Sequence, residues 1–217
     1  MRIVYLVDVH DRFDAVPRTM EQAGPADLLL IGGDVTTGGT PDDAAHAVES
    51  WLPLAPRLLA VAGNMDSAAI DDRLAELGVA LDGRGVRFGD LGVFGASAAP
   101  ISPLHTPYEL TDDELERRLE QGFSEVEASR LTLCCPHAPP HDTACDRLAS
   151  GEHVGSAAVR AFVERRQPDL VLCGHIHEAR AEDRIGRSRI VNPGPARDGY
   201  YAVVEANGEL TFSLATF

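Results

Sequence analysis

Two histidines, His175 and His177, follow an apolar run over residues 170–173 that ends at Gly174. The run has the length and composition of a short buried strand, so we expect the histidines in the loop just beyond its end. In a loop, two imidazoles at positions i and i+2 can converge on one cation or be shared by two adjacent cations, whereas in a strand they would point to opposite faces. A His-x-His sequence on its own is more often exposed to solvent than bound to a metal. The metal hypothesis therefore depends on whether other strands of the chain also end in polar residues that can bind metal.

Four earlier apolar runs also end in polar residues of the kinds that bind metals. The carboxylate, carboxamide and imidazole groups that follow the five runs are Asp8, His10, Asp34, Asn64, His137, His175 and His177. A ligand set without thiolate suits Mn, Fe, Zn, Ni or Co, and we expect Mn first. Mg and Ca prefer sites with more oxygen ligands. Seven donors exceed what one ion can use. Two divalent ions roughly 3.5 Å apart could share one carboxylate, an arrangement suited to displacement at phosphorus.

The elements that must position these residues alternate between strand and helix in the first third of the chain. Strands are predicted over 3–7, 28–31 and 58–62, and helices over 13–23, 41–52 and 67–77. Pro41 suits a first helical turn and Ser67 an N-cap. This alternation predicts right-handed crossovers and a parallel sheet. Because ligands bind at the carboxyl ends of such strands, the polar clusters after them should meet on one rim.

The rest of the chain predicts further strands and two more helices. Strands are expected over 86–88, 91–94 and 131–135, and antiparallel strands over 180–185, 188–192, 200–206 and 210–214. One helix should run from a capping box at Thr111 to about Ser129, and the other from 155 or 156 to 167. The stretch 96–107 is rich in Ala, Ser and Pro without periodicity, so we expect a long surface loop that could cover the crevice.

Composition sets limits on the class of protein. With 217 residues, 44% of them hydrophobic, the chain suits one domain over residues 1–217, and no apolar run is long enough to span a membrane. Its four cysteines form no Cys-x-x-Cys pair, so we expect a reduced, cytoplasmic protein. The net charge is -15, so the surface should repel nucleic acid and anionic membranes except where bound cations reverse the local field. A homo-oligomer is compatible with the sequence.

Taken in order, five motifs resemble the signature of the calcineurin-like metallophosphoesterases. They are Asp8-x-His10, Gly33-Asp34, Gly63-Asn64, His137 and Gly174-His175-x-His177, and the match extends to Gly194. The segment from 137 to 156, together with 173 to 178, is similar in particular to the small prokaryotic Icc-related phosphoesterases. The resemblance implies an α/β fold in which two mixed β-sheets lie face to face with helices outside, a four-layer α-β-β-α sandwich.

The resemblance also implies roles for the seven residues. Asp8, His10 and His177 would hold one divalent ion, Asn64, His137 and His175 would hold the other, and Asp34 would bridge them. A metal-bound hydroxide would attack the phosphorus of a small phosphoester, and we assign His10, Asp34 and Asn64 to catalysis. A bound cation can lower the pKa of its water from 15.7 to about 7, so a nucleophile exists at neutral pH without a side-chain base.

The sequence departs from the family pattern at two positions beside the expected ligands. Many members carry Gly-Asn-His, in which the histidine protonates the leaving group, but here Met65 and Asp66 follow Asn64. Asp66 could act as an acid if its pKa were raised, although an N-cap or supporting role is at least as well favoured. Asp11 stands where the family usually has glycine, and either shifts the loop or places a carboxylate beside a ligand histidine.

Three nearby residues are expected to play lesser roles. Arg12 is interpreted as a surface arginine rather than a phosphate contact, because the Gly-Asp-x-x-Asp-Arg motif of the phosphoprotein phosphatases is missing after Gly33. His141 and His153 are expected in loop or supporting positions, although a helix start just after His153 could receive an anion.

The function predicted from these motifs is hydrolysis of a small phosphoester, with a phosphodiesterase favoured over a protein phosphatase. A phosphomonoesterase acting on nucleotides or small metabolites is the alternative within the class. A non-catalytic protein-binding scaffold of the same fold, like the retromer scaffold subunit, is the alternative from another class, but a decayed site would have lost ligands and all seven are present. No basic stripe suited to a nucleic-acid polymer is visible.

Overall fold

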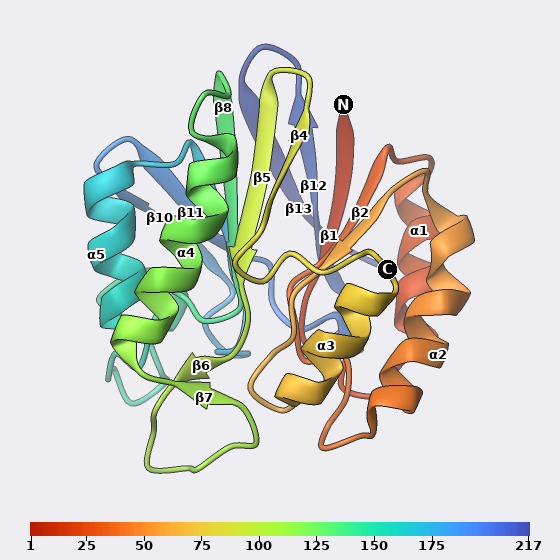
Figure 1. The fold of residues 1–217 in the computed structure, drawn as a ribbon, viewed down its shortest axis with the longest axis horizontal. Helices are drawn as coiled ribbons and strands as arrows, with labels where there is room; N and C mark the ends of the chain where they lie inside the picture. The colour runs from red at the N-terminus through yellow and green to blue at the C-terminus, as the bar shows by residue number, and fades with distance from the viewer.

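The computed structural model describes residues 1–217 and contains two large β-sheets that lie face to face (Figure 1). The first sheet has the order β13-β12-β1-β2-β3, and the second has the order β10-β11-β9-β8-β5-β4. The strands of the first sheet are β1 (Arg2–Leu6), β2 (Leu28–Ile31), β3 (Leu58–Ala60), β12 (Tyr200–Ala206) and β13 (Leu210–Thr216). Those of the second sheet are β4 (Gly85–Phe88), β5 (Leu91–Ala96), β8 (Leu131–Pro136), β9 (Leu170–Leu172), β10 (Ala181–Ile185) and β11 (Ser188–Asn192).

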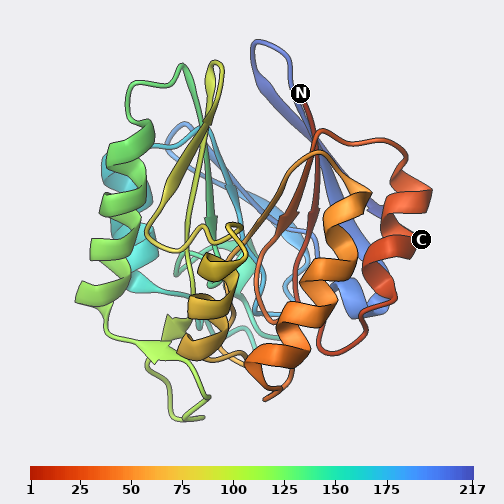
Figure 2. The same cartoon turned by 45° about the vertical axis from the view of Figure 1, so that its right-hand side comes forward.

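Helices cover the outer face of each sheet (Figures 1 and 2). The first sheet is covered by α1 (Ala15–Ala23), α2 (Pro41–Trp51) and α3 (Ala68–Glu76), and the second by α4 (Asp112–Val126) and α5 (Ala157–Arg166). Short 3-10 turns lie over Leu52–Leu54, Ala144–Asp146 and Ala196–Asp198. The predicted α/β four-layer sandwich is therefore confirmed.

The five apolar runs that carry the polar clusters divide between the two sheets. In the first sheet β1, β2 and β3 are parallel, as their alternation with helices predicts. The strands β8 and β9 are also parallel to each other but belong to the second sheet. The rim predicted for one parallel sheet is thus formed jointly by two sheets, because the chain moves to the second sheet after α3.

Strand alternation explains why both faces of β1 are buried. Val4 and Leu6 point outward into the core beneath α1 and α2, whereas Ile3, Tyr5 and Val7 point inward to the core between the sheets. A third cluster of buried apolar side chains lies between the second sheet and the helices α4 and α5. Full burial of a large aliphatic side chain stabilises a fold by about 1.5 to 3 kcal/mol, so β1 is a central structural element as well as the carrier of the first polar cluster.

Helix starts follow the predicted signals. Ser67 accepts a hydrogen bond from the Ile70 backbone at the start of α3, and Thr111 forms a reciprocal capping box with Glu114 at the start of α4. Helix ends are less well predicted, since α4 stops at Val126 rather than near Ser129. No helix has the length and apolar character needed to cross a bilayer. All four cysteines are buried and free.

The stretch 96–107 is only partly the surface loop that the sequence suggested. Its first residues are buried, and β6 (Ala99–Pro100) pairs with β7 (Glu109–Leu110). Ser97 is fully buried because its hydroxyl accepts a hydrogen bond from the Ala62 backbone at 2.8 Å. The surface-loop expectation was wrong at this end, since a polar residue with buried partners can lie in the interior. Ile101 and Leu104 further along are exposed.

A buried polar network joins this stretch to α3 and α4. The Asp71 carboxylate accepts hydrogen bonds from the Ser97 hydroxyl at 2.7 Å and the Tyr108 hydroxyl at 2.8 Å. Arg118 on α4 lies 3.7 Å from Asp71 and forms a short ion pair with Asp82. Two carboxylates thus share one arginine in the interior, so one of them is favoured in its protonated form.

Replacing Asp71 with asparagine should flatten the pH dependence of stability. Burial, and then the charge of Asp82, raises the pKa of Asp71 to about 7 from an ordinary value of 3.8. The folded protein therefore retains a proton that the unfolded chain releases between about pH 4 and pH 7, and the free energy of unfolding falls as pH rises through this window.

Urea unfolding at about pH 4.5 and about pH 7.5 measures this loss. Since each pKa unit is worth about 1.4 kcal/mol, the loss should be at least about 1 kcal/mol larger in wild type than in Asp71→Asn. All other titrating groups are common to the two proteins, so an equal loss in both would contradict the assignment.

Candidate metal centre

All seven predicted donors lie in loops at the carboxyl ends of five strands. Asp8 and His10 follow β1, Asp34 follows β2 and Asn64 follows β3, while the remaining three follow the neighbouring strands of the second sheet: His137 after β8, and His175 and His177 after β9. Parallel strands bring their carboxyl ends to the same edge, and the face-to-face packing of the sheets brings the two edges together.

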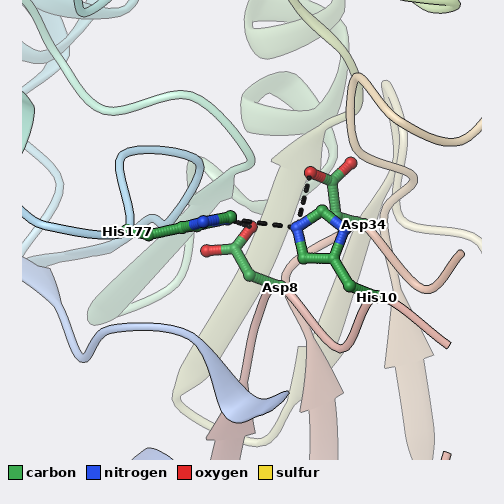
Figure 3. Close-up of side chains that lie close together, drawn as sticks. All are labelled: Asp8, His10, Asp34 and His177. Atoms are coloured by element: carbon green, nitrogen blue, oxygen red, sulfur yellow. Dashed lines mark hydrogen bonds and ion pairs between the residues drawn. The ribbon is translucent and has the colours of Figure 1, made fainter. Parts of the chain in front are cut away.

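Four of the side chains point at one another, as Figure 3 shows. One donor atom from each of Asp8, His10, Asp34 and His177 lies within 4.8 Å of the others. The Nε2 atom of His10 is 3.0 Å from Nε2 of His177 and 3.5 Å from Oδ2 of Asp34, and His177 Nε2 is 3.7 Å from Oδ1 of Asp8. Two ring nitrogens and two carboxylates therefore face a common point.

The other three residues join this group through Asp34. The Nε2 atom of His137 lies 3.5 Å from Oδ2 of Asp34 and 3.0 Å from Oδ1 of Asn64. The ring of His175 is 5.3 Å from the ring of His137, and its backbone N–H donates to the Asp8 carboxylate at 3.0 Å. The structure thus brings all seven predicted residues together, with Asp34 between His10 and His137.

Four of the seven donors have a strained backbone conformation. Positive φ angles occur at Asp8 (59°), His10 (47°), Asp34 (49°) and His175 (68°). Side chains other than glycine rarely adopt this left-handed region, and each such residue costs on the order of 1 kcal/mol or more. The sharp reversal turns each side chain away from its strand and toward the shared point, so the fold tolerates strain where the donors must converge.

Glycines precede three of the donors because nothing larger fits. A Cβ atom on Gly63 would overlap the carboxylate of Asp34, and one on Gly174 would overlap Val7 and come within 2.8 Å of Oδ2 of Asp8. Gly33 combines a φ of 104° with close approach to the ring of His137. The Gly-Asp, Gly-Asn and Gly-His pairs of the sequence are therefore packing requirements of a crowded site.

The electrostatics of the group couple Asp34 to His137. Burial disfavours the charged ring of His137, but the charge of Asp34 and the hydrogen bond to it outweigh burial and raise the pKa of His137 to about 9. Burial alone would raise the pKa of Asp34, yet the His137 ring and then His10 hold it below its usual range. For His175, burial and the neighbouring His137 lower the pKa to about 4.

These residues fit divalent cations. Asp8 and Asp34 are buried without an arginine or lysine partner, which is costly for two carboxylates unless a cation balances them. The proton that His137 holds toward Asp34 and Asn64 occupies a position where a cation could replace it. His137 turns its other nitrogen to the Gly32 carbonyl at 2.8 Å, which fixes the ring with Nε2 toward the site.

His10 is oriented in a similar way by a residue that the sequence analysis missed. Its Nδ1 lies 2.9 Å from the hydroxyl of Thr37. The Asp11 carboxylate accepts a hydrogen bond from the Thr37 backbone at 3.2 Å. Asp11 has a φ of 63°, a conformation that favours the glycine usually found at this position in the calcineurin-like metallophosphoesterases. Of the two alternatives for Asp11, the structure supports a carboxylate that steadies the loop beside a donor histidine.

Comparison with known proteins agrees with this arrangement. The Calcineurin-like phosphoesterase superfamily domain matches residues 1–209. The chain belongs to this superfamily. The resemblance drawn from the motifs is thereby confirmed.

Relatives and solved structures extend the comparison. An uncharacterized protein, MJ1162 of Methanocaldococcus jannaschii, is 30% identical over 201 residues, covering 90% of this chain and 88% of the relative. The protein TT1561 of Thermus thermophilus is similar in structure with a TM-score of 0.76 and 16% identity, over 99% of this chain and 98% of that one. A dimetal phosphatase from Danio rerio gives a TM-score of 0.60 at 11% identity, over 100% and 96%. At such identities, the structural likenesses establish the fold alone.

Asp66 of this calcineurin-like chain has a supporting position. Its carboxylate is buried and accepts hydrogen bonds from the backbone of Val35, Thr36 and Gly63 at 2.8 to 3.0 Å, and from the Thr36 hydroxyl at 2.9 Å. Burial, and then the charge of Asp34, raises the pKa of Asp66 to about 6. Although the pKa is raised, both oxygens already bind the loops that carry Asp34 and Asn64, so the geometry favours the supporting role, and Ser67 is the helix N-cap.

The other histidines near the rim in sequence lie outside the donor group. A ring nitrogen of His153 lies 2.6 Å from the Asp146 carboxylate, and the His153 ring is 6.1 Å from that of His141. The helix that begins after His153 is capped by Ser156, whose hydroxyl accepts from the Val159 backbone. Arg197, whose guanidinium is 3.1 Å from Nδ1 of His177, was not expected at the site from the sequence. Its place just after Asn192-Pro193-Gly194, at the end of the family match, was the available signal.

Replacing Asp34 with asparagine should lower the amount of metal that the protein binds. Asp34 is the one carboxylate within 3.5 Å of both His10 and His137, so its loss removes a charge from both halves of the group. After incubation with Mn²⁺ and gel filtration, elemental analysis should find clearly less metal per chain than in wild type. Asp142→Asn, at an exposed carboxylate outside the group, is the matched control and should bind as wild type does. Equal metal content in Asp34→Asn and wild type would contradict the assignment.

Replacing Asp66 with asparagine should affect stability more than turnover. The NH2 group of the asparagine would face a backbone N–H group that now donates to the Asp66 carboxylate. The lost hydrogen bond should lower the free energy of unfolding by about 1 to 3 kcal/mol. At saturating metal, we expect kcat for an aryl phosphodiester to change by less than about tenfold, since other residues hold the ions. Denaturant unfolding and steady-state kinetics together check this. A loss of kcat of about a thousandfold with full metal content would instead identify Asp66 as the acid.

Proposed function

We propose that this protein is a dinuclear metal-dependent phosphoester hydrolase, and that its substrate is a small phosphodiester. The observation that carries the proposal is the convergence of Asp8, His10, Asp34 and His177 within 4.8 Å, joined through Asp34 to His137 and Asn64. Membership of the calcineurin-like phosphoesterase superfamily supports the class of reaction.

The donor group divides into two halves that suit two ions. Asp8, His10 and His177 would hold one, and Asn64, His137 and His175 the other. Asp34 would bridge them, which is supported by the equal 3.5 Å distances from its Oδ2 to the Nε2 atoms of His10 and His137. When bound, two divalent ions, of which Mn²⁺ is our first candidate, activate water and neutralise charge on phosphoryl oxygens. The similarity to a dimetal phosphatase is consistent with this number of ions.

The chain's own residues fix the geometry in which the reaction occurs. Thr37 and the Gly32 carbonyl orient the rings of His10 and His137, and Asp66 holds the loops of Asp34 and Asn64 at a fixed separation. Holding the rings of His10 and His137 in place contributes to the rate in two-metal sites, because it orients the metal ligands before the reaction begins.

The absence of a histidine after Asn64 favours a substrate whose leaving group needs no protonation, and the missing Gly-Asp-x-x-Asp-Arg motif after Gly33 disfavours a protein substrate. Met65 occupies the position from which that histidine would protonate a leaving group, and Met65 has no titratable group. A substrate with a good leaving group needs no such acid. A phosphomonoesterase remains the alternative within the class. The scaffold alternative is disfavoured because all seven donors are retained and oriented.

Removal of metal should abolish hydrolysis of an aryl phosphodiester, and Mn²⁺ should restore it. Bis(p-nitrophenyl) phosphate and p-nitrophenyl phosphate are compared side by side, with Mn, Ni, Co, Fe and Zn added to the chelator-treated protein. We expect the diester to have the higher kcat/KM, and Asp34→Asn to lower kcat/KM by at least about a hundredfold.

Three results are informative. A higher kcat/KM for the monoester would favour the alternative within the class. Activity that is unaffected by the chelator, or equal in Asp34→Asn and wild type, would contradict a metal-dependent hydrolase.

A further inference from the structure

A small recess lies beside the metal centre, between the start of α1 and the turn Ala196–Asp198. Its volume is about 220 Å³, and its walls include Arg12, Arg18 and Arg197 together with Asp14 and Asp198. Figure 2 shows the end of β13, where the chain reaches Phe217, next to α1 at this side of the molecule. The recess thus has three arginines against two aspartates, on a chain of net charge -15.

Arg197 connects the recess to the metal centre. Its backbone N–H donates to the Asp8 carbonyl at 3.3 Å, and its Nη2 lies 3.1 Å from Nδ1 of His177. No carboxylate lies within 4.0 Å of its guanidinium. The larger recess of about 510 Å³ near Glu178 differs, because none of its lining residues is hydrogen-bonded to the seven donors and it has three carboxylates against two arginines.

The contact between Arg197 and His177 is of an unusual kind. His10 and His137 turn Nδ1 toward a hydroxyl and a carbonyl, both of which can accept a proton. A guanidinium can only donate. A histidine that binds a cation through Nε2 carries its proton on Nδ1, so two donors would then face each other at His177. Arg197 therefore has no acceptor on this ring in a metal-loaded site, and its N–H groups are available to an anion.

The other two arginines are also only loosely paired. Arg12 and Arg18 share one carboxylate, Asp14, at 3.7 Å each, which is beyond hydrogen-bond distance. Exposed pairs of this kind contribute little. A phosphate or carboxylate group in the recess could therefore accept hydrogen bonds from them without breaking a strong ion pair. Arg12 is exposed, as expected of a surface arginine, but it lies on the wall of this recess.

We propose that this recess binds a second anionic group of the substrate, so that the preferred substrates are phosphoesters in which another phosphate adjoins the one that is cleaved. This rests on the proposed function, since the metal centre must hold the first phosphate. Arg197 is the specificity-determining residue, because it adjoins both the centre and the recess. Arg12 and Arg18 form the far wall and would receive the remaining oxygens of the second group.

The test is a comparison of two ligands that differ by one phosphate. Calorimetric titration of Mn-loaded protein, at a fixed free Mn²⁺ concentration, gives the Kd of adenosine 5′-monophosphate and of the non-hydrolysable α,β-methylene analogue of adenosine 5′-diphosphate. The nucleoside is common to both, so the ratio of the two Kd values reports the second group. We expect wild type to bind the diphosphate analogue at least about tenfold more tightly, as charge-assisted hydrogen bonds imply.

Arg197→Ala should reduce this ratio to about one, and Arg12→Ala should reduce it partly. Arg87→Ala, at an exposed arginine of β4 far from the recess, should retain the wild-type ratio. A ratio of about one in wild type, or an unchanged ratio in Arg197→Ala, would overturn the proposal. Hydrolysis of bis(p-nitrophenyl) phosphate, measured in parallel on wild type, separates the two ideas. If wild type hydrolyses the diester but shows no preference for the diphosphate analogue, the proposed function stands and the role of the recess is contradicted. If wild type is inactive, the proposed function itself is contradicted.

Discussion

The burial of two carboxylates, Asp8 and Asp34, without arginine or lysine is the constraint on which the rest of the site depends. Isolated buried charges are costly, so their neighbours must supply positive charge or hydrogen bonds. Here imidazoles do so, and the raised pKa of His137 is the direct result of its contact with Asp34. A divalent cation satisfies the same requirement more fully, because one ion can contact several of these donors at once. A bound cation should therefore also stabilise the loops that carry these carboxylates.

The fold supplies this arrangement at a cost in backbone strain. Left-handed conformations at Asp8, His10, Asp34 and His175 turn the side chains off the strand ends, and Gly63 and Gly174 leave room for the neighbouring carboxylates. The strain is tolerated because β1 and its neighbours are buried on both faces and hold the loops in place. Two buried carboxylates outside the donor group also hold these loops in place through hydrogen bonds. Asp66 ties two donor loops together, and Asp71 binds Ser97 and Tyr108, which contact the backbone of Ala62 and Asn64.

The sequence was most informative where one residue type has one structural use. Apolar runs followed by Asp, Asn or His identified the strands and all seven converging residues, and before Asp34, Asn64 and His175 the sequence also has the glycine that the crowded position requires. The division of the five runs between two sheets was not derivable from periodicity, because a parallel strand has the same pattern in either sheet. Thr37, Arg197 and the buried position of Ser97 were also missed, because a single polar residue in a loop gives no signal until its partners are known.

Anomalous diffraction from crystals soaked with Mn²⁺ tests most directly whether cations are held between the two halves of the donor group. Two anomalous peaks are expected on either side of the Asp34 carboxylate, roughly 3.5 Å apart. One peak should lie against Asp8, His10 and His177, and the other against Asn64, His137 and His175. Ions found only elsewhere on the surface, or none among these side chains at saturating Mn²⁺, would contradict the account.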